Sequence, residues 1–230
     1  DAFKDNLDVS FQKLKEKKQQ NIIYATAISL FLILIITIGF YRRYKFIKMT
    51  NAIIEEEKNR SNTLLLNILP EETALELKKN GKVQAKKFES VTVLFTDFEK
   101  FTHYAEKLSP EKLVESIDFY FSKFDTIMEK YNLEKIKTVG DSYMCAGGLP
   151  FPTEDHAYRV VLAALEIVRF VDISKELNVN EYNGGAIGVE INTGPIVAGV
   201  VGIKKFSYDI WGDTVNIASR MESNSEPGKI

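Results

Sequence analysis

The chain has 230 residues, 45% of them hydrophobic, and a formal net charge of −2. This length accommodates one domain of catalytic size and an accessory segment. Basic and acidic residues are balanced and the globular part has no long basic run, so we expect no nucleic-acid partner. The single cysteine excludes an internal disulfide framework. Because the first residue is Asp1 rather than methionine, we interpret the sequence as a fragment of a longer protein.

Residues 22–41, IIYATAISLFLILIITIGFY, form a run of 20 residues without a charge. As a helix that rises ~1.5 Å per residue, this run spans the roughly 30 Å hydrocarbon core of a bilayer. A buried helix of a soluble protein usually keeps a polar stripe, and a signal peptide has a shorter apolar region. We therefore predict a single transmembrane helix at 22–41, preceded by an extramembrane juxtamembrane segment at 1–21.

Charge leaves the orientation of this helix open, because both flanks are equally basic. The basic residues are Lys13, Lys15, Lys17 and Lys18 before the helix, and Arg42, Arg43, Lys45 and Lys48 after it. If the part of the chain after this helix uses a cytosolic substrate, that part must lie on the cytoplasmic side of the membrane, and only this requirement would fix the orientation.

Residues 42–80 read as a helical linker. A seven-residue frame places Ile47, Ile54, Ser61 and Ile68 in one seam, alternating with Asn51, Lys58 and Leu65. This seam is apolar at its ends and polar in its middle, so a short parallel coiled coil and a solvated helix both fit. Pro70 predicts a stop at Leu69, and residues 71–79 form a second helix that Asn80 and Gly81 end.

From residue 90 the pattern becomes that of a mixed domain. We predict strands at 91–95, 186–191 and 196–201, a hairpin of 133–139 with 142–146, and helices at 110–131, 156–173 and 214–223. Residues 192–195, NTGP, read as a turn between the last two strands. The order β-α-β-β-α-β predicts an α+β fold, a ferredoxin-like split βαβ sheet with helices packed on one face.

Two carboxylates occupy strand ends in this pattern. Asp97 follows the apolar strand VTVLFT, and Asp141 lies at the tight turn of the predicted hairpin. Either residue alone could merely cap a strand. Together they supply the hard oxygen ligands that Mg²⁺ prefers when it also binds substrate phosphates. The pair therefore predicts phosphoryl or nucleotidyl transfer.

Three separated motifs resemble the class III nucleotide cyclases, in the order of that family. They are VTVLFTDFEKFT at 91–102, KIKTVGDSYM at 135–144 and YDIWGDTVNIASRM at 208–221. The segment SNTLLLNILP at 61–70 is similar to the coupling helix that precedes the family's catalytic domain. The resemblance covers roughly residues 55–230, and it implies a nucleotide cyclase domain at 81–230.

The resemblance implies a metal site and a purine site. Asp97 and Asp141 match the two metal-binding aspartates, with the backbone carbonyl of Phe98 as a further ligand beside the substrate, for two Mg²⁺ or Mn²⁺ ions per active site. Lys137 and Asp209 match the positions that read the purine edge, where guanylyl members carry a glutamate and a small residue. Lysine can donate to adenine N1 and aspartate can accept from the 6-amino group. The chain thus resembles an adenylate cyclase that uses ATP.

Asn216 and Arg220 lie four residues apart, and so on one face of the last predicted helix. They match the catalytic residues that orient the ribose and stabilise charge on the α-phosphate. In this family the metal aspartates of one protomer face the purine, asparagine and arginine residues of the other. A chain that holds both sets is expected to form a homodimer, through the catalytic domain and the linker, with two equivalent sites.

The sequence departs from the family pattern in three places. Lys100 stands where the first motif usually has glycine, Phe98 replaces a common isoleucine, and the chain ends at Ile230, before the family's last strands and its triphosphate-binding lysine. This end predicts weak or absent activity for the chain by itself. The sequence favours a membrane-anchored adenylate cyclase with its C-terminal domain in the cytoplasm and an unidentified upstream sensor. A guanylate cyclase and a catalytically silent dimerisation module are the alternatives.

Overall fold

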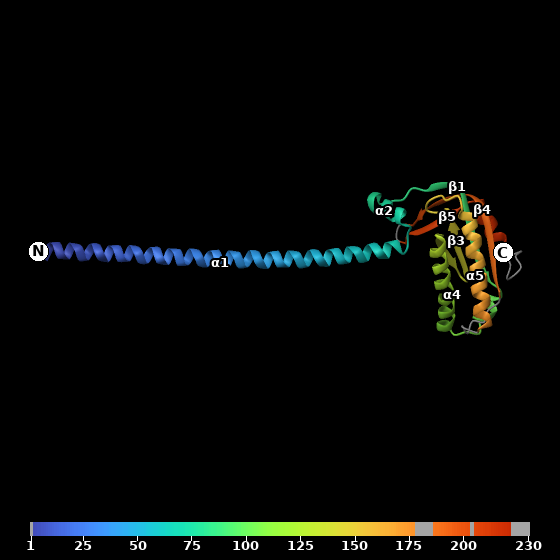
Figure 1. Cartoon of the computed structure of the whole chain (residues 1–230), viewed down its shortest axis with the longest axis horizontal. Coiled ribbons are helices and arrows are strands. Elements are labelled where there is room, and N and C mark those ends of the chain that lie inside the picture. The colour runs from blue at the N-terminus through green and yellow to red at the C-terminus, as the bar shows by residue number, and fades with distance from the viewer. Residues whose placement is uncertain (1, 178–185, 203–204, 222–230) are drawn as a thin grey trace. The chain divides into compact units, whose positions relative to one another are not determined.

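The computed structural model describes residues 2–177, 186–202 and 205–221, and it divides into two units, Asp1–Leu64 and Leu65–Ile230. The second unit contains the whole sheet (Figure 1). The elements in chain order are α1 (Ala2–Leu66), α2 (Glu71–Asn80), β1 (Lys86–Phe98), α3 (Phe101–Ala105), α4 (Pro110–Tyr131), β2 (Glu134–Val139), β3 (Ser142–Gly147), α5 (His156–Glu176), β4 (Ile187–Val201), β5 (Ser207–Trp211) and α6 (Asp213–Met221).

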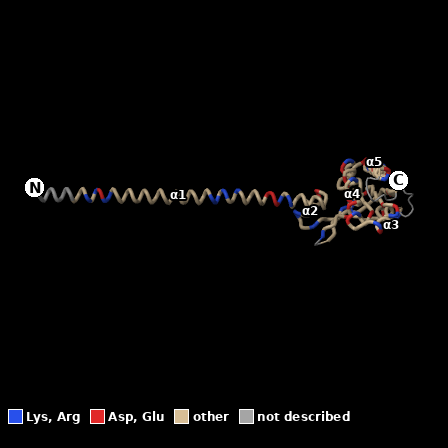
Figure 2. The backbone as a smooth tube through the Cα atoms, turned by 90° about the horizontal axis from the view of Figure 1, so that it is seen from below, with Lys and Arg blue, Asp and Glu red and all other residues tan. Residues whose placement is uncertain are grey.

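α1 is one continuous helix that includes both the uncharged run and most of the predicted linker. By length and composition it could cross a membrane, and the apolar window is fully exposed in the isolated chain. Figure 2 shows the uncharged stretch between segments that carry blue and red residues. α1 ends at Leu66, four residues before Pro70, and α2 ends at Asn80, followed by Gly81 in the left-handed conformation (φ 69°). α1 thus ends three residues before the predicted stop at Leu69, whereas α2 ends at the predicted Asn80 and Gly81 signal.

The sheet has the strand order β2-β3-β1-β4-β5, and every neighbouring pair is antiparallel. β3 lies between β1 and β2, which the helix α4 connects, so β1, α4 and β2 form a split βαβ unit as predicted. β5 extends the sheet beyond β4 and was not predicted, nor was the short helix α3.

Two hydrophobic clusters lie on opposite faces of the sheet, because successive side chains of a strand alternate. α4 and α5 cover the first, which contains Leu94, Phe124, Cys145, Ile167 and Val189 (Figure 1). The second contains Leu69, Val93, Met144, Ile210 and Ala218, and so includes residues of β5 and α6. The prediction that helices pack on one face only was therefore wrong, because α6 helps to cover the other face.

The predicted turn at residues 192–195 was also wrong. β4 runs without a break through these residues. Gly194 is needed because a Cβ there would lie 2.6 Å from Oγ1 of Thr214 in α6, so this glycine permits a close approach of helix and strand. Pro195 accepts a hydrogen bond from Thr214 (2.7 Å) and lies opposite the irregularity in β1 between Phe88 and Val91. A residue without an N–H is tolerated there.

Candidate active site

The two predicted metal aspartates lie side by side. Thr96 at the end of β1 is paired with Tyr143 of β3, so the next residue, Asp97, lies beside the turn of the β2–β3 hairpin. Ser142 Oγ donates a hydrogen bond to Asp97 Oδ1 (2.8 Å). In the two-residue turn only Gly140 has a positive φ (63°), the pattern of a type II′ turn, which leaves Asp141 at the tip. The sequence had not predicted the role of Ser142, although it follows Asp141 directly.

The electrostatics of this pair favour a cation. Burial, and then the nearby negative charge of Asp97, raise the pKa of Asp141 to about 6. The backbone N–H of Phe98 opposes this rise by donating to the Asp141 carboxylate. Among the described residues no group of three or more acidic, histidine or cysteine side chains could hold a metal ion, so protein ligands here are few. Two crowded carboxylates and backbone oxygens fit Mg²⁺, which keeps much of its shell for water and phosphate.

Lys100 shows why its position favours glycine. Its φ is 59°, in the left-handed region, where a residue with a Cβ is strained. The residue immediately precedes α3, and its Nζ lies 2.9 Å from Glu99 Oε1. Lys100 therefore adopts a backbone conformation that glycine would adopt without this strain.

Lys137 and Asp209 are in direct contact although they are far apart in the sequence. Nζ of Lys137 on β2 lies 2.6 Å from Oδ2 of Asp209 on β5. The other carboxylate oxygen of Asp209 accepts from the N–H of Ile210 (2.9 Å), which fixes the orientation of the carboxylate. The Asp209 side chain is 16% exposed and that of Lys137 is 40% exposed, so both side chains are partly accessible to a ligand. The structure thus brings together the two residues predicted to read a purine.

Asn216 and Arg220 lie on α6, both with exposed side chains. α6 begins at Asp213, and the last two residues of the predicted helix at 214–223 lie outside the described residues. Asn192 of β4 donates to the carbonyl of Thr214 (3.0 Å), which fastens the start of α6 to the sheet. The two predicted catalytic residues therefore lie on a helix attached to β4. The two aspartates lie elsewhere, at the end of β1 and in the turn between β2 and β3.

Glu134 is a titratable group in this region that the sequence analysis did not single out. It begins β2 and lines an open cleft, together with Leu69, Met128 and Leu133. Burial raises its pKa to about 7. Its charge also raises the pKa of Tyr208, as a lesser cause than burial.

We expect Glu134→Gln to stabilise the domain in a pH-dependent way. A folded-state pKa above the unfolded value means that the native state binds more protons, so the wild type loses stability as pH rises from about 4.5 to about 7. The variant should gain roughly 1–3 kcal/mol at pH 8 and little at pH 4.5. Urea unfolding at the two pH values, followed by the fluorescence of the single tryptophan, Trp211, measures this.

Glu166→Gln is the control with the opposite sign. Hydrogen bonds from Lys130 and Tyr131 lower the pKa of Glu166, so its replacement should cost stability at pH 8. Equal pH dependence in the wild type and in Glu134→Gln would contradict the prediction.

Comparisons with known proteins identify the family of the chain. The pattern of the adenylate and guanylate cyclase catalytic domain matches residues 83–230. The chain is 41% identical over 180 residues to an adenylate cyclase of Mycobacterium tuberculosis, which covers 78% of this chain and 40% of that protein. It is 42% identical over 176 residues to guanylate cyclase soluble subunit beta-2 of Rattus norvegicus, 76% of this chain and 25% of that protein. The chain thus spans less than half the length of these relatives.

A solved structure is similar as well. The catalytic core of a rhodopsin-guanylyl cyclase with converted specificity, in complex with ATPαS, superposes with a TM-score of 0.58 and 36% identity, over 63% of this chain and 77% of that one. Relatives of both nucleotide specificities are present, so the comparisons leave the choice of purine to the site itself. The family as a whole uses divalent metal ions, which fits the crowded aspartates. From its motifs, fold and relatives, this chain belongs to the class III adenylate and guanylate cyclases.

Proposed function

We propose that this chain is an adenylate cyclase that converts ATP to 3′,5′-cyclic AMP and pyrophosphate. The observation that carries the proposal is the contact of Lys137 Nζ with Asp209 Oδ2 at 2.6 Å. Adenine offers an acceptor at N1 beside a donor at the 6-amino group, which complements a lysine donor next to a carboxylate acceptor. Guanine offers the reverse pattern, a donor at N1 and a carbonyl at position 6, and so leaves both protein groups unsatisfied.

The reaction is an internal displacement at the α-phosphate. The ribose 3′-oxygen loses its proton to solvent and forms a bond to the α-phosphorus, while the bond from that phosphorus to the bridging oxygen breaks and pyrophosphate leaves. The guanidinium of Arg220 can donate two hydrogen bonds to phosphate oxygens, and Asn216 on the same face of α6 orients the ribose. Catalysis is mainly alignment and charge stabilisation.

Asp97, Asp141 and the backbone carbonyl of Phe98 would hold two Mg²⁺ or Mn²⁺ ions, which would acidify the 3′-hydroxyl and bind the leaving pyrophosphate. The mutual repulsion of the two carboxylates supports this assignment, because a cation between them relieves it. Ser142 orients the Asp97 carboxylate through a hydrogen bond to Oδ1.

We further propose that two copies of the chain form each active site. One surface, at the end of β1, carries the aspartates, and another, formed by β2, β5 and α6, carries the purine and ribose residues. A symmetric dimer that places the first surface against the second would create two equivalent sites. The uncharged stretch of α1 supports anchoring in a lipid membrane, and the use of ATP supports a cytoplasmic position of the domain.

Production of cyclic AMP and cyclic GMP by the full-length protein, with Mg²⁺ or Mn²⁺, tests the choice of nucleotide. Preferential turnover of ATP is the expected result. Preference for GTP would assign the chain to the guanylate cyclases. A folded dimer that turns over neither nucleotide would leave only the silent dimerisation module.

Mixing two inactive variants tests the shared site. Asp97→Asn damages one surface and Arg220→Ala the other, so each homodimer should be inactive. In an equal mixture half of the dimers are mixed, and each mixed dimer has one intact site and one doubly damaged site. We therefore expect about a quarter of the wild-type activity per protomer, from the symmetry of the dimer. If the mixture stays as inactive as its components, each site belongs to one chain and the dimer proposal is wrong.

A further inference from the structure

Strand β2 contains a bulge between its two lysines. Lys135 is paired with Cys145 of β3, but Lys137 is paired with Met144, so Ile136 is an extra residue without a partner of its own. Paired residues of an antiparallel ladder point to the same face of the sheet. Cys145 belongs to the cluster beneath α4 and α5, and Met144 belongs to the cluster on the opposite face.

The bulge therefore sends two lysines that are two residues apart to opposite faces. In a regular strand, residues i and i+2 share a face, and both lysines would compete for one environment. Regular pairing continued from the start of β2 would turn Lys137 toward α4 and away from Asp209. Regular pairing continued from the hairpin turn would turn Lys135 away from α4. Only the bulge satisfies both contacts.

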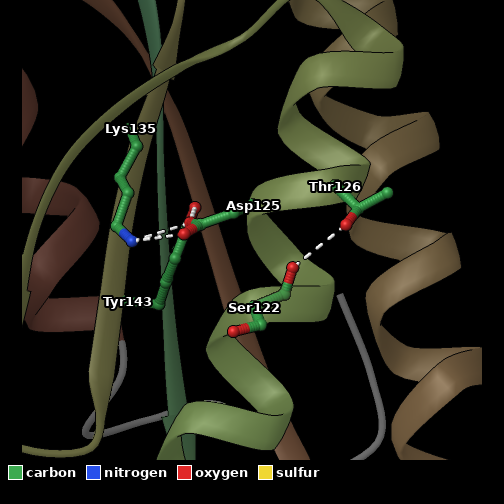
Figure 3. A network of polar contacts seen from close by, with 5 residues as sticks. All are labelled: Ser122, Asp125, Thr126, Lys135 and Tyr143. Carbon is green, nitrogen blue, oxygen red and sulfur yellow. Dashed lines mark hydrogen bonds and ion pairs between the residues drawn. The ribbon is translucent and has the colours of Figure 1, made fainter. Parts of the chain in front are cut away.

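Lys135, the first of these two lysines, forms an ion pair with Asp125 of α4. Nζ of Lys135 lies 2.7 Å from Oδ1 of Asp125 and 2.8 Å from its Oδ2. The hydroxyl of Tyr143 donates to the same carboxylate (2.6 Å), and Nζ of Lys135 lies 5.1 Å from the centre of the tyrosine ring. Figure 3 shows Lys135 and Tyr143, from neighbouring strands, pointing to this one carboxylate.

The tyrosine makes this contact stronger than an ordinary surface ion pair. The side chains of Lys135 and Asp125 are 40% and 44% exposed, and exposed pairs contribute at most about 1 kcal/mol. Tyr143, however, is completely buried, and burial raises the pKa of its hydroxyl far above the ordinary value, so it remains a donor. Loss of its acceptor would leave a buried hydroxyl unsatisfied.

We propose that Asp125 and Lys135 are positioning residues: they hold the bulge at Ile136 and thereby aim Lys137 at the purine. This inference rests on the proposed function, in which Lys137 and Asp209 read the base. Bulges next to active sites commonly re-aim a side chain, and here the residue that follows the bulge is Lys137 itself. The contacts of Asp125 and Lys135 described above are with each other and with Tyr143, not with Asp209 or the aspartate pair. Their effect on nucleotide selectivity must therefore be transmitted through β2.

The test is Lys135→Met in the full-length protein, because methionine preserves the stem over Tyr143 and leaves the tyrosine–Asp125 hydrogen bond intact. We expect the KM for ATP to rise about tenfold and kcat to change less. The ratio of kcat/KM for ATP to that for GTP should fall about tenfold, because the purine loses roughly one charged hydrogen bond. Lys135→Arg keeps the charge and should restore the wild-type ratio. Asp125→Asn, which retains an acceptor for Tyr143, should lower the ratio as Lys135→Met does.

Glu166→Gln is the matched control. Glu166 accepts from Lys130 Nζ (2.5 Å) and from the hydroxyl of Tyr131 (2.9 Å), the same arrangement as at Asp125, but it joins α4 to α5. The ratio of kcat/KM for ATP to that for GTP in Glu166→Gln should equal that of the wild type. In a Lys137→Ala background, Lys135→Met should have no further effect on the ratio, because the residue through which it acts is gone.

The outcomes separate the inference from the function on which it rests. A wild type that turns over neither nucleotide, or does not prefer ATP, overturns the proposed function, and the inference fails with it. The inference alone is overturned if the wild type prefers ATP but Lys135→Met leaves the ATP-to-GTP ratio of kcat/KM unchanged. It is also overturned if Lys135→Met still lowers this ratio in the Lys137→Ala background. Misfolding of both Lys135→Met and Asp125→Asn, with Glu166→Gln folded, would show a role in folding and also overturn it.

Discussion

Replacing Asp97 or Asp141 by asparagine is expected to lower cyclase activity on the order of 10³-fold or more, while the dimer and the fold persist. Metal-ion charge stabilisation is worth several kcal/mol, and each 1.36 kcal/mol is a factor of ten in rate. Asparagine has nearly the same shape and can still accept the hydrogen bond from Ser142 at position 97. It lacks the charge that binds the cations, so higher Mn²⁺ concentrations should recover only part of the activity.

The same substitutions should stabilise the metal-free protein at pH 7.5. Burial, and then the negative charge of Asp97, raise the pKa of Asp141 to about 6, so ionisation of Asp141 above pH 6 costs free energy in the folded protein. A raised carboxyl pKa means that stability falls as pH rises from about 4 to 6. Asp141→Asn removes this loss, and Asp97→Asn removes the part of it that the charge of Asp97 contributes. The melting temperature of Asp97→Asn should therefore exceed that of the wild type at pH 7.5 without metal, and equal it near pH 4.

Asp155→Asn is the control, because Asp155 forms a partly exposed ion pair with Arg159 at the start of α5, outside the turn that carries Asp141. It should retain full activity and gain no stability at high pH. A variant of Asp97 that is inactive but less stable than the wild type at pH 7.5 would contradict the repulsion argument, since its inactivity would then reflect damage to the fold.

The sequence predicted the hairpin and its aspartates because their signals are local. A glycine followed by an aspartate between two apolar runs specifies a tight turn, and alternation gives the flanking strands. The split βαβ order followed from the same periodicities. α4 was predicted at its observed bounds, with Ser109 accepting from the backbone of Lys112 at its start.

Features that depend on distant residues could not be predicted. Gly194 and Pro195 read as a turn, but they lie within β4 because Thr214 of α6, some 20 residues later, must approach the strand closely. The bulge at Ile136 has no local signal either, because a strand that reads lysine, isoleucine, lysine fits regular alternation. Its cause is a pair of contacts on opposite faces, Lys135 with Asp125 and Lys137 with Asp209. Tertiary contacts therefore decided the register where local propensity was neutral.

Exchanging the purine-reading pair should change the nucleotide preference. We expect Lys137→Glu with Asp209→Ser to shift the ratio of kcat/KM for ATP to that for GTP by about 10²- to 10⁴-fold toward GTP, because a site built from hydrogen bonds rejects a base that leaves them unpaired. Glutamate can accept from guanine N1, and serine can donate to the carbonyl at position 6. Initial rates with each nucleotide at saturating Mn²⁺ measure the shift.

The single changes sharpen this prediction. Lys137→Glu alone places a second carboxylate where Nζ now lies 2.6 Å from Asp209, so repulsion replaces attraction and the variant should lose activity with both nucleotides. Asp209→Ser alone leaves Lys137 without its ion-pair partner and should weaken ATP use without admitting GTP. The double variant should therefore use GTP better than either single variant. The same exchange at the pair that joins α4 to α5, Lys130→Glu with Glu166→Ser, should leave the preference unchanged. A double variant at positions 137 and 209 that still prefers ATP would mean that other contacts select the base.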